Sequence, residues 1–276
     1  MIITVVGLGV IGGSYVQALK GLGHDVYGVD QDLLTLQQAK ADGCIIEGYV
    51  DGHDIIRQSD MTIICLYPSL VLDFIAKHTF KKGSIVTDVV GIKSYFLEKA
   101  LTMIDSDVEY VSGHPMAGRE KKGYAYASKQ VFQNANYIVI EHQKNKKESI
   151  EFMCHFVSQL GFKSVKIMSP YDHDEIISFT SQLPHTIAVA LMNSDNQKYE
   201  TGKYIGDSFR DLTRIANINA DLWSELFLNN REYLLLSMKR FEKQFDLLKQ
   251  ALIDGDEETL KKMFDESSKR REKLEK

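Results

Sequence analysis

The sequence has few cysteines, few prolines, no long hydrophobic run and no surplus of positive charge. Its three cysteines, Cys44, Cys65 and Cys154, are far apart, which excludes a disulfide framework and the ligand spacing of a zinc site. No stretch reaches the roughly 18 consecutive apolar residues that span a bilayer, and the first residues lack the basic start of a signal peptide. We therefore expect a cytoplasmic protein with free thiols, no metal and no membrane partner.

The charge balance is slightly acidic. Lys and Arg number 33 against 38 Asp and Glu, which gives a net charge of −5. A general nucleic-acid binder needs a surplus of cations to displace counterions, so we expect no nucleic-acid partner. Hydrophobic residues make up 44% of the chain, which is typical of a globular protein and argues against disorder.

Glycine is unevenly distributed along the 276 residues. Sixteen of the 19 glycines lie at or before Gly161, so the first part is rich in turns and the remainder is expected to be helical. This length suits two ordinary domains, and we place the boundary so that they span 1–168 and 169–276.

In the first part, β-branched or apolar runs alternate with helical spacing. Strands are expected at 2–6, 25–29, 61–66, 84–89, 109–112, 137–141 and 165–168, and helices at 10–22, 32–41 and 146–160. Such alternation predicts an α/β fold with a doubly wound parallel sheet.

The second part carries one apolar stripe at helical spacing. It consists of Trp223, Phe227, Leu234, Met238, Phe241, Phe245, Leu248 and Leu252. A seam this long is buried only against other helices. Those helices belong either to the same chain or to a second copy in a homodimer.

A glycine-rich run directly follows the first expected strand and opens a helix. The run is Gly7, Leu8, Gly9, Val10, Ile11 and Gly12, a G-x-G-x-x-G motif. Glycine at 7 permits the tight turn, glycine at 9 lets a pyrophosphate approach the backbone, and glycine at 12 lets helix and strand pack closely. The context favours dinucleotide binding over a glycine turn that binds nothing.

Asp30 indicates which dinucleotide binds. It ends the next expected strand, about 20 residues after the motif, where a carboxylate accepts hydrogen bonds from the ribose hydroxyls. The carboxylate repels a 2′-phosphate, and the next two residues, Gln31 and Asp32, supply no cation to hold one. The sequence therefore favours NAD over NADP.

His114 lies in a candidate active-site loop. The segment Ser112-Gly113-His114-Pro115-Met116-Ala117-Gly118 follows an expected strand, and loops at the carboxyl ends of strands border the ligand crevice. Imidazole is the side chain best suited to accept a proton near neutral pH. For a lone histidine, the favoured interpretation is one that only caps a turn.

Two segments of the second part are unlike simple helix. Pro184 lies inside a long helical pattern and is expected to kink or restart the helix just before His185. Further on, the segment 208–216 (SFRDLTRIA) concentrates charge, and Arg210 and Arg214 are four residues apart, so on a continuous helix they would share a face. Asp211 can neutralise either arginine, which leaves the other for an anionic ligand.

Together the segments GLGVIGGS, GHPMAG with its following RE, and SFRDLTRIA resemble the prephenate dehydrogenase family over almost the whole chain. The resemblance implies a Rossmann-type domain followed by an all-α dimerisation domain. It also implies NAD-dependent oxidative decarboxylation of prephenate to 4-hydroxyphenylpyruvate in tyrosine biosynthesis. Arogenate dehydrogenase is the nearest alternative, and an NAD-sensing protein without catalysis is a remote one.

The resemblance also implies roles for individual residues. His114 becomes the catalytic base that accepts the ring-hydroxyl proton, and Arg214 holds a substrate carboxylate. Ser181 and His185 line the substrate pocket, with Arg119 and Glu120 at its mouth. One position departs from the family's D-x-G-S-x-K segment, because Gly91 stands where many members have serine. Either Ser94 or a water is expected to replace that hydroxyl.

Overall fold

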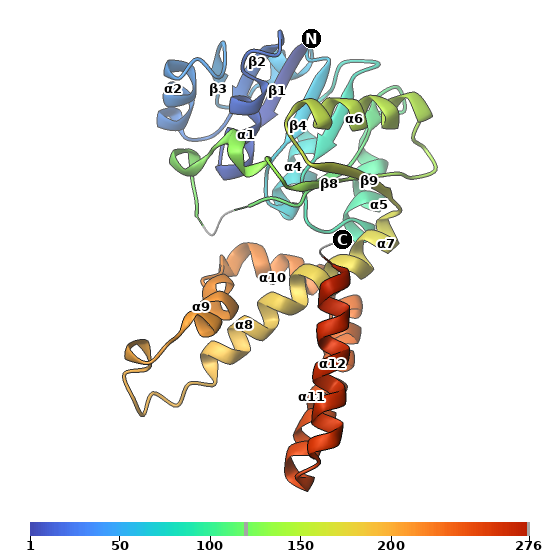
Figure 1. Ribbon diagram of the computed structural model, residues 1–276. Coiled ribbons are helices and arrows are strands. Elements are labelled where there is room, and N and C mark those ends of the chain that lie inside the picture. The colour runs from blue at the N-terminus through green and yellow to red at the C-terminus, as the bar shows by residue number, and fades with distance from the viewer. Residues whose placement is uncertain (119–120, 275–276) are drawn as a thin grey trace.

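The computed structural model describes residues 1–118 and 121–274. Figure 1 shows two parts, a sheet domain that carries the N-terminus and a group of helices that extends away from it. Helices α11 (Arg231–Asp254) and α12 (Glu257–Lys273) form a long hairpin that points away from the sheet. Within the described residues, we find no helix long and apolar enough to cross a membrane.

The main sheet has six parallel strands in the order β3-β2-β1-β4-β5-β6. They are β1 (Ile2–Val6), β2 (Asp25–Val29), β3 (Gly48–Tyr49), β4 (Met61–Ile64), β5 (Ile85–Asp88) and β6 (Glu109–Tyr110). The strand order reverses between β1 and β4, and ligands of open α/β sheets bind outside the carboxyl ends at such a point. The predicted α/β fold is confirmed.

Helices cover both faces of this sheet. Side chains of α1 (Val10–Leu19), α2 (Leu33–Ala41) and α6 (Lys147–Gln159) share one buried apolar cluster with the sheet. Those of α3 (His53–Ile56), α4 (Pro68–Lys77) and α5 (Ser94–Met103) share the other. The fully buried strand β4 fits between the two clusters, as its continuous apolar run predicts.

Among the described residues, the other three strands form a second, smaller sheet. This arrangement corrects two predictions. Strands β8 (Asn136–Ile140) and β9 (Ser164–Met168) pair with each other and not with the main sheet. Residues 113–115, predicted as a loop, form β7 (Gly113–Pro115), antiparallel to β8. The glycine makes this strand possible, because a Cβ at Gly113 would lie 2.0 Å from the Tyr137 hydroxyl.

The helical part begins with one interrupted helix. Helix α7 (Pro170–Ile177) runs into a π-helical segment, Ser178–Gln182, and α8 (Leu183–Asn193) begins again with Pro184 in its first turn. The predicted effect of this proline is confirmed, since its missing N–H is tolerated only in a first turn. Helices α9 (Asp207–Thr213) and α10 (Ala220–Asn229) follow and lie beside α8 (Figure 1).

The apolar stripe of α11 is only partly covered within one chain. Leu234 is buried, but Phe245 is 58% exposed and Leu252 is 61% exposed. The hairpin of α11 and α12 therefore has an exposed apolar surface, of the kind that a second layer of helices covers.

Candidate active site

The glycine motif forms a tight turn at the carboxyl end of β1. Gly7 has a φ of +81°, and a Cβ there would lie 2.6 Å from the backbone oxygen of Cys65. A Cβ at Gly12 would meet the backbone oxygen of Gly7 at 1.9 Å, so helix α1 packs directly on the turn. Gly9 instead faces open space, which leaves room for a phosphate at the start of α1.

Asp30 lies beside this turn. Its Oδ2 accepts a hydrogen bond from the Leu8 backbone N–H at 2.6 Å, and its Oδ1 accepts one from Asp32 at 2.9 Å. These contacts fix the carboxylate at the end of β2, where the ribose of a dinucleotide would lie. Leu8 is buried and Val10 and Ile11 are partly buried, so the motif's non-glycine residues secure the turn. The residues present fit NAD.

His114 is the middle residue of β7 and heads a buried hydrogen-bonded chain. Its Nδ1 lies 2.8 Å from Nε2 of His173, and Nδ1 of His173 lies 2.8 Å from Oδ1 of Asp174. The Asp174 carboxylate also accepts the backbone N–H of Lys93 at 2.8 Å and that of Ser94 at 2.7 Å. The first turn of α7 is thereby joined to the first turn of α5.

A fully buried lysine supports the same region from behind. Lys93 Nζ donates to Asp88 Oδ1 at 2.8 Å, to Ser112 Oγ at 2.9 Å and to the Gly113 backbone oxygen at 2.7 Å. These three bonds use all three donors of an ammonium group. Tyr110 donates to the other Asp88 oxygen at 2.8 Å. The buried ion pair of Lys93 and Asp88, which is hydrogen-bonded on both sides, therefore holds the start of β7 in place.

Burial keeps both imidazoles of the chain neutral. It lowers the pKa of His114 well below its ordinary value, and the neighbouring His173 and Lys93 lower it further. Burial also lowers the pKa of His173, against the opposing hydrogen bond to Asp174. For Asp174, burial raises the pKa, but the hydrogen bonds from His173 and Ser94 outweigh it and the net shift is downward. The site therefore combines neutral imidazoles with an ionised carboxylate.

The second ring nitrogen of His114 faces Gly91. A Cβ built at Gly91 would lie 3.7 Å from His114 Nε2 and 3.4 Å from Leu226 Cδ2, both ordinary contact distances. Leu226 belongs to α10, so the helical part closes directly over this position. The serine that the family pattern places here would carry a hydroxyl on the Nε2 side of the imidazole, which Gly91 does not supply.

Further side chains of the helical part lie near Leu226. Trp223, one turn earlier on α10, lies against the ring of His185 with centroids 3.7 Å apart. His185 Nδ1 lies 2.9 Å from the backbone oxygen of Ser181, at the junction of the π-helical segment and α8. Ser181 and His185 are therefore in contact, and Trp223 joins them.

Arg214 begins a 3₁₀ turn, Arg214–Ala216, that packs against α8. The two arginines do not lie on one continuous helix, because α9 ends at Thr213. Arg210 pairs with Asp207 at 3.3 Å, not with Asp211, and this ion pair is exposed. Arg210 therefore belongs to an exposed ion pair, whereas Arg214 lies in the turn that packs against α8. Arg119 and Glu120, predicted at the mouth of the pocket, lie outside the described residues.

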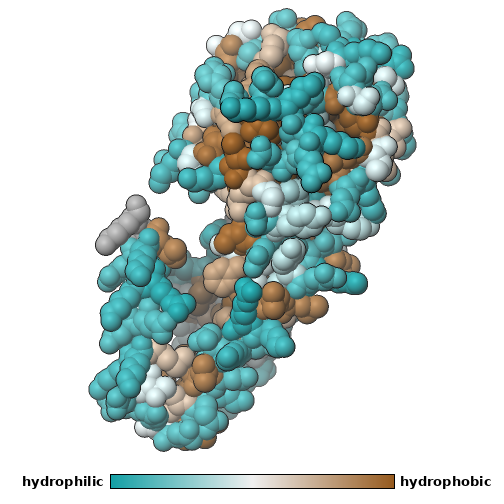
Figure 2. Space-filling view, turned by 90° about the vertical axis from the view of Figure 1, so that its right-hand side faces the viewer, coloured by the Kyte–Doolittle hydropathy of each residue, from teal (hydrophilic) through white to brown (hydrophobic). Residues whose placement is uncertain are grey.

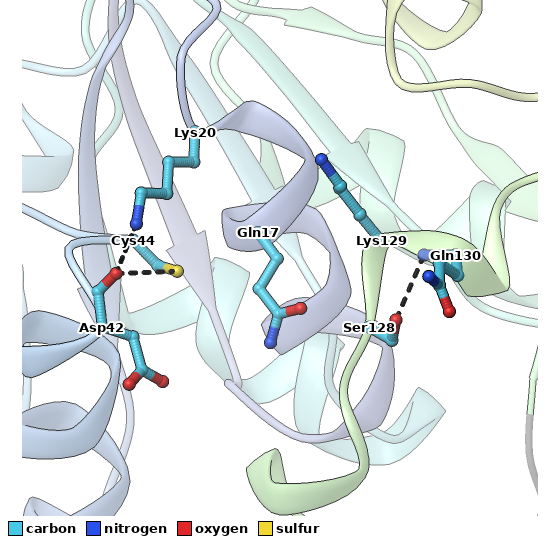
Figure 3. Close-up of a pocket in the computed structure, with 7 residues that line it drawn as sticks. All are labelled: Gln17, Lys20, Asp42, Cys44, Ser128, Lys129 and Gln130. Atoms are coloured by element: carbon cyan, nitrogen blue, oxygen red, sulfur yellow. Dashed lines mark hydrogen bonds between the residues drawn. The ribbon is translucent and has the colours of Figure 1, made fainter.

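Two surface cavities lie away from these groups. One, of about 370 Å³, opens beside the C-terminal half of α1, and Figure 3 shows Lys20 bonded to the Asp42 backbone oxygen on one side of it. The other, of about 760 Å³, is bordered by α5, the β8–α6 connection and the start of α7, and Ser94 lines it.

Several of these residues were not predicted from the sequence. His173, Asp174, Asp88 and Lys93 meet only through the fold, although the tandem His173-Asp174 shortly before the Ser181–His185 segment is a usable signal. Asp88 and Lys93 are the first and last residues of the stretch that corresponds to the family's D-x-G-S-x-K segment, but their burial and their ion pair are seen only in the structure.

The glycine turn, the carboxylate at the end of β2 and the partly buried imidazole at the same sheet edge define a dinucleotide-dependent oxidoreductase. Residues 16–166 match the family described as "Prephenate dehydrogenase, nucleotide-binding domain", and residues 169–266 match "Prephenate dehydrogenase, dimerization domain". The chain belongs to the prephenate dehydrogenase family. It is a dehydrogenase of this family, with a nucleotide-binding domain whose residues fit NAD and a helical domain that matches the family's dimerization domain.

Individual relatives agree with this assignment. The prephenate dehydrogenase of Bacillus subtilis (strain 168) is 29% identical over 273 residues, which are 95% of this chain and 73% of that protein. Prephenate dehydrogenase from A. aeolicus, solved in complex with hydroxyphenyl propionate and NAD+, is 26% identical with a TM-score of 0.89, covering 99% and 98% of the two chains. Synechocystis arogenate dehydrogenase is 25% identical with a TM-score of 0.85, covering 99% and 100%.

Proposed function

We propose that this enzyme oxidises prephenate with NAD+ to 4-hydroxyphenylpyruvate and carbon dioxide. The observation that carries the proposal is the imidazole of His114, whose Nδ1 is bonded within the protein while Nε2 faces the space beside Gly91. A base with a lowered pKa in that position stays unprotonated at neutral pH. The proposed setting is the cytoplasm, with residues 1–168 binding NAD and 169–276 binding substrate and the second copy.

The proposed chemistry assigns one task to each group. His114 Nε2 accepts the proton of the ring hydroxyl as the hydride leaves the same carbon, and loss of the ring carboxylate as carbon dioxide makes the ring aromatic. Bound NAD+ supplies the hydride acceptor, held by the turn at 7–12 and by Asp30. Arg214 binds a substrate carboxylate, since its planar fork matches two oxygens. Ser181 and His185 line the pocket, and Arg119 and Glu120 are assigned to its mouth.

Arogenate is the second candidate substrate. Arogenate dehydrogenase from Synechocystis has nearly the same fold similarity to this chain as the A. aeolicus prephenate dehydrogenase. The two substrates share the ring and differ in the side chain, so the same base and hydride acceptor serve both.

One measurement tests the proposal. NADH absorbance is followed with the purified dimer, NAD+ and either prephenate or arogenate. We expect a higher kcat/KM with prephenate. A preference for arogenate would assign the second substrate, and no NADH with either would leave the remote alternative, an NAD-sensing protein.

A further inference from the structure

The buried chain behind His114 determines where protons sit on its two imidazoles. An ionised carboxylate only accepts hydrogen bonds, so His173 Nδ1 must carry the hydrogen that reaches Asp174 Oδ1 at 2.8 Å. A neutral imidazole has one N–H, so His173 Nε2 is left as an acceptor. The hydrogen in the 2.8 Å contact with His114 Nδ1 then comes from His114. His114 Nε2 is left with its lone pair.

We propose that Asp174 and His173 are positioning residues that hold His114 in the tautomer whose Nε2 accepts a proton. This inference rests on the proposed function, in which His114 is the base. It adds a role for two residues of α7, a helix outside the sheet that carries His114. The general precedent is the ligand histidine of a metal site, whose tautomer is set by the bond its other nitrogen makes.

The carboxylate at the end of the chain is itself fixed. Asp174 accepts two backbone N–H groups from the first turn of α5, and its own backbone oxygen accepts Asn230 Nδ2 at 3.0 Å. Asn230 also donates to Gln182 at 2.8 Å, which ties this point to the π-helical segment. The chain therefore has a rigid anchor and not a mobile carboxylate.

The charged groups around the two imidazoles come from two elements. The β5–α5 segment contributes Asp88 and Lys93, which neutralise each other, and α7 contributes Asp174. Helix α10 contributes the apolar Leu226 near Gly91. When His114 accepts a proton, Asp174 is the negative charge that the hydrogen-bonded chain connects to it, so it favours the imidazolium.

The first experiment replaces the middle of the chain. His173→Phe keeps a ring but removes both hydrogen bonds, and we expect kcat to fall about 10- to 100-fold with both KM values unchanged. His173→Gln retains an acceptor and a donor and should recover part of this loss. The matched control is His142→Gln, which changes a partly buried histidine that bonds the Tyr110 backbone oxygen, and it should keep native kcat.

The second experiment changes the anchor and follows pH. In Asp174→Asn, the amide nitrogen must face either Ser94 N–H or the Lys93 and His173 donors. We expect a lower plateau of kcat/KM and an acid limb displaced to lower pH, because the charge that favours the imidazolium is gone. Native kcat and an unmoved limb, with only a lower melting temperature, would show that the chain is merely structural.

A third measurement needs no variant. Nitrogen-15 spectra of the histidine-labelled wild-type dimer report which ring nitrogen carries hydrogen. We expect Nδ1–H for both His114 and His173, and Nε2–H on His114 would overturn the proposal. The activity of His114→Asn distinguishes failure of the proposed function from failure of the positioning role. If this activity is native, the assignment of His114 as the base fails. If it is lost while the His173 and Asp174 variants are native, only the positioning role fails.

Discussion

An ion pair of the sheet domain and an ion pair of the helical domain differ strongly in burial. The ion pair of Lys93 and Asp88 is 0% exposed on both sides, and every donor of the ammonium is used. The ion pair of Arg210 and Asp207 is 59% and 93% exposed. Burial strengthens electrostatic interactions and raises the cost of a missing partner, whereas exposed pairs contribute little.

This difference assigns the two domains different work. In the proposed function the sheet domain holds the reacting groups in one geometry, because Lys93 and Asp88 behind them are buried and hydrogen-bonded. The helices leave apolar and charged side chains exposed within one chain, where a second copy and, in the proposed function, the substrate would contact them. Each prediction below tests one side of this comparison, from the largest expected effect to the smallest.

The largest effect on kcat is expected at His114, the proposed base in the sheet domain. His114→Asn is expected to lower kcat about 10²- to 10⁴-fold, because general-base help is lost, while NAD+ binding is retained. The measurement is steady-state NADH formation together with NAD+ titration. A variant with near-native kcat would remove His114 from the mechanism.

The buried lysine should show the largest effect on stability. Lys93→Met leaves Asp88 charged without a partner, and we expect the free energy of unfolding to fall by about 3–5 kcal/mol. Urea denaturation at fixed protein concentration measures this, since dimerisation contributes to stability. Lys82→Met, which breaks an exposed pair with Asp107, is the matched control and should leave stability unchanged. Equal effects in both variants would contradict the comparison.

The two domains also differ in how far the sequence predicts them. The main sheet and Asp30 follow from local patterns, because alternation and glycine spacing are read along the chain. The β7 strand was missed since its reason, the Tyr137 hydroxyl beside Gly113, comes from a distant segment. The chain from His114 to Asp174 was missed for the same reason. The exposure of Phe245 could be seen only in the structure, because an apolar stripe in the sequence does not show whether the same chain or a second copy covers it.

Asp30 tests the cofactor side of the sheet edge. In Asp30→Ser combined with Gln31→Arg, a 2′-phosphate meets a cation in place of a carboxylate. We expect the ratio of kcat/KM for NADP+ over NAD+ to rise at least about tenfold, which is ~1.4 kcal/mol. Asp25→Ser, at the opposite end of the same strand β2, is the control and should leave the ratio unchanged. A wild-type enzyme that uses both cofactors equally would contradict the argument from Asp30.

Arg214 tests the helical side. Arg214→Ala is expected to raise the KM for prephenate at least about tenfold, because a charge-assisted bond contributes about 1.5–3 kcal/mol. Arg214→Lys should recover little, since an ammonium lacks the planar fork. Arg210→Ala removes only an exposed pair with Asp207 and should keep the native KM. If Arg214→Ala melts earlier but keeps its KM, the arginine only stabilises the helical domain.

The smallest effect is expected at Gly91, where the two domains meet. A Cβ fits there at ordinary contact distances from His114 Nε2 and Leu226, and the glycine has no positive φ, so serine should be tolerated. In Gly91→Ser the new hydroxyl lies within reach of both the imidazole and a substrate hydroxyl. One neutral hydrogen bond contributes about 0.5–1.5 kcal/mol, so we expect kcat/KM for prephenate to rise roughly two- to tenfold.

Ser94→Ala is the matched comparison for Gly91→Ser. Ser94 lines the cavity beside α5 and its Oγ has no hydrogen-bond partner within the described residues, so its loss should leave kcat/KM unchanged. A loss in Ser94→Ala that Gly91→Ser restores would instead identify Ser94 as the hydroxyl that replaces the family's serine. If Gly91→Ser has native kcat/KM, a water already occupies the place of that hydroxyl. A lower kcat/KM would mean that the new hydroxyl bonds Nε2 and competes with the substrate for the base.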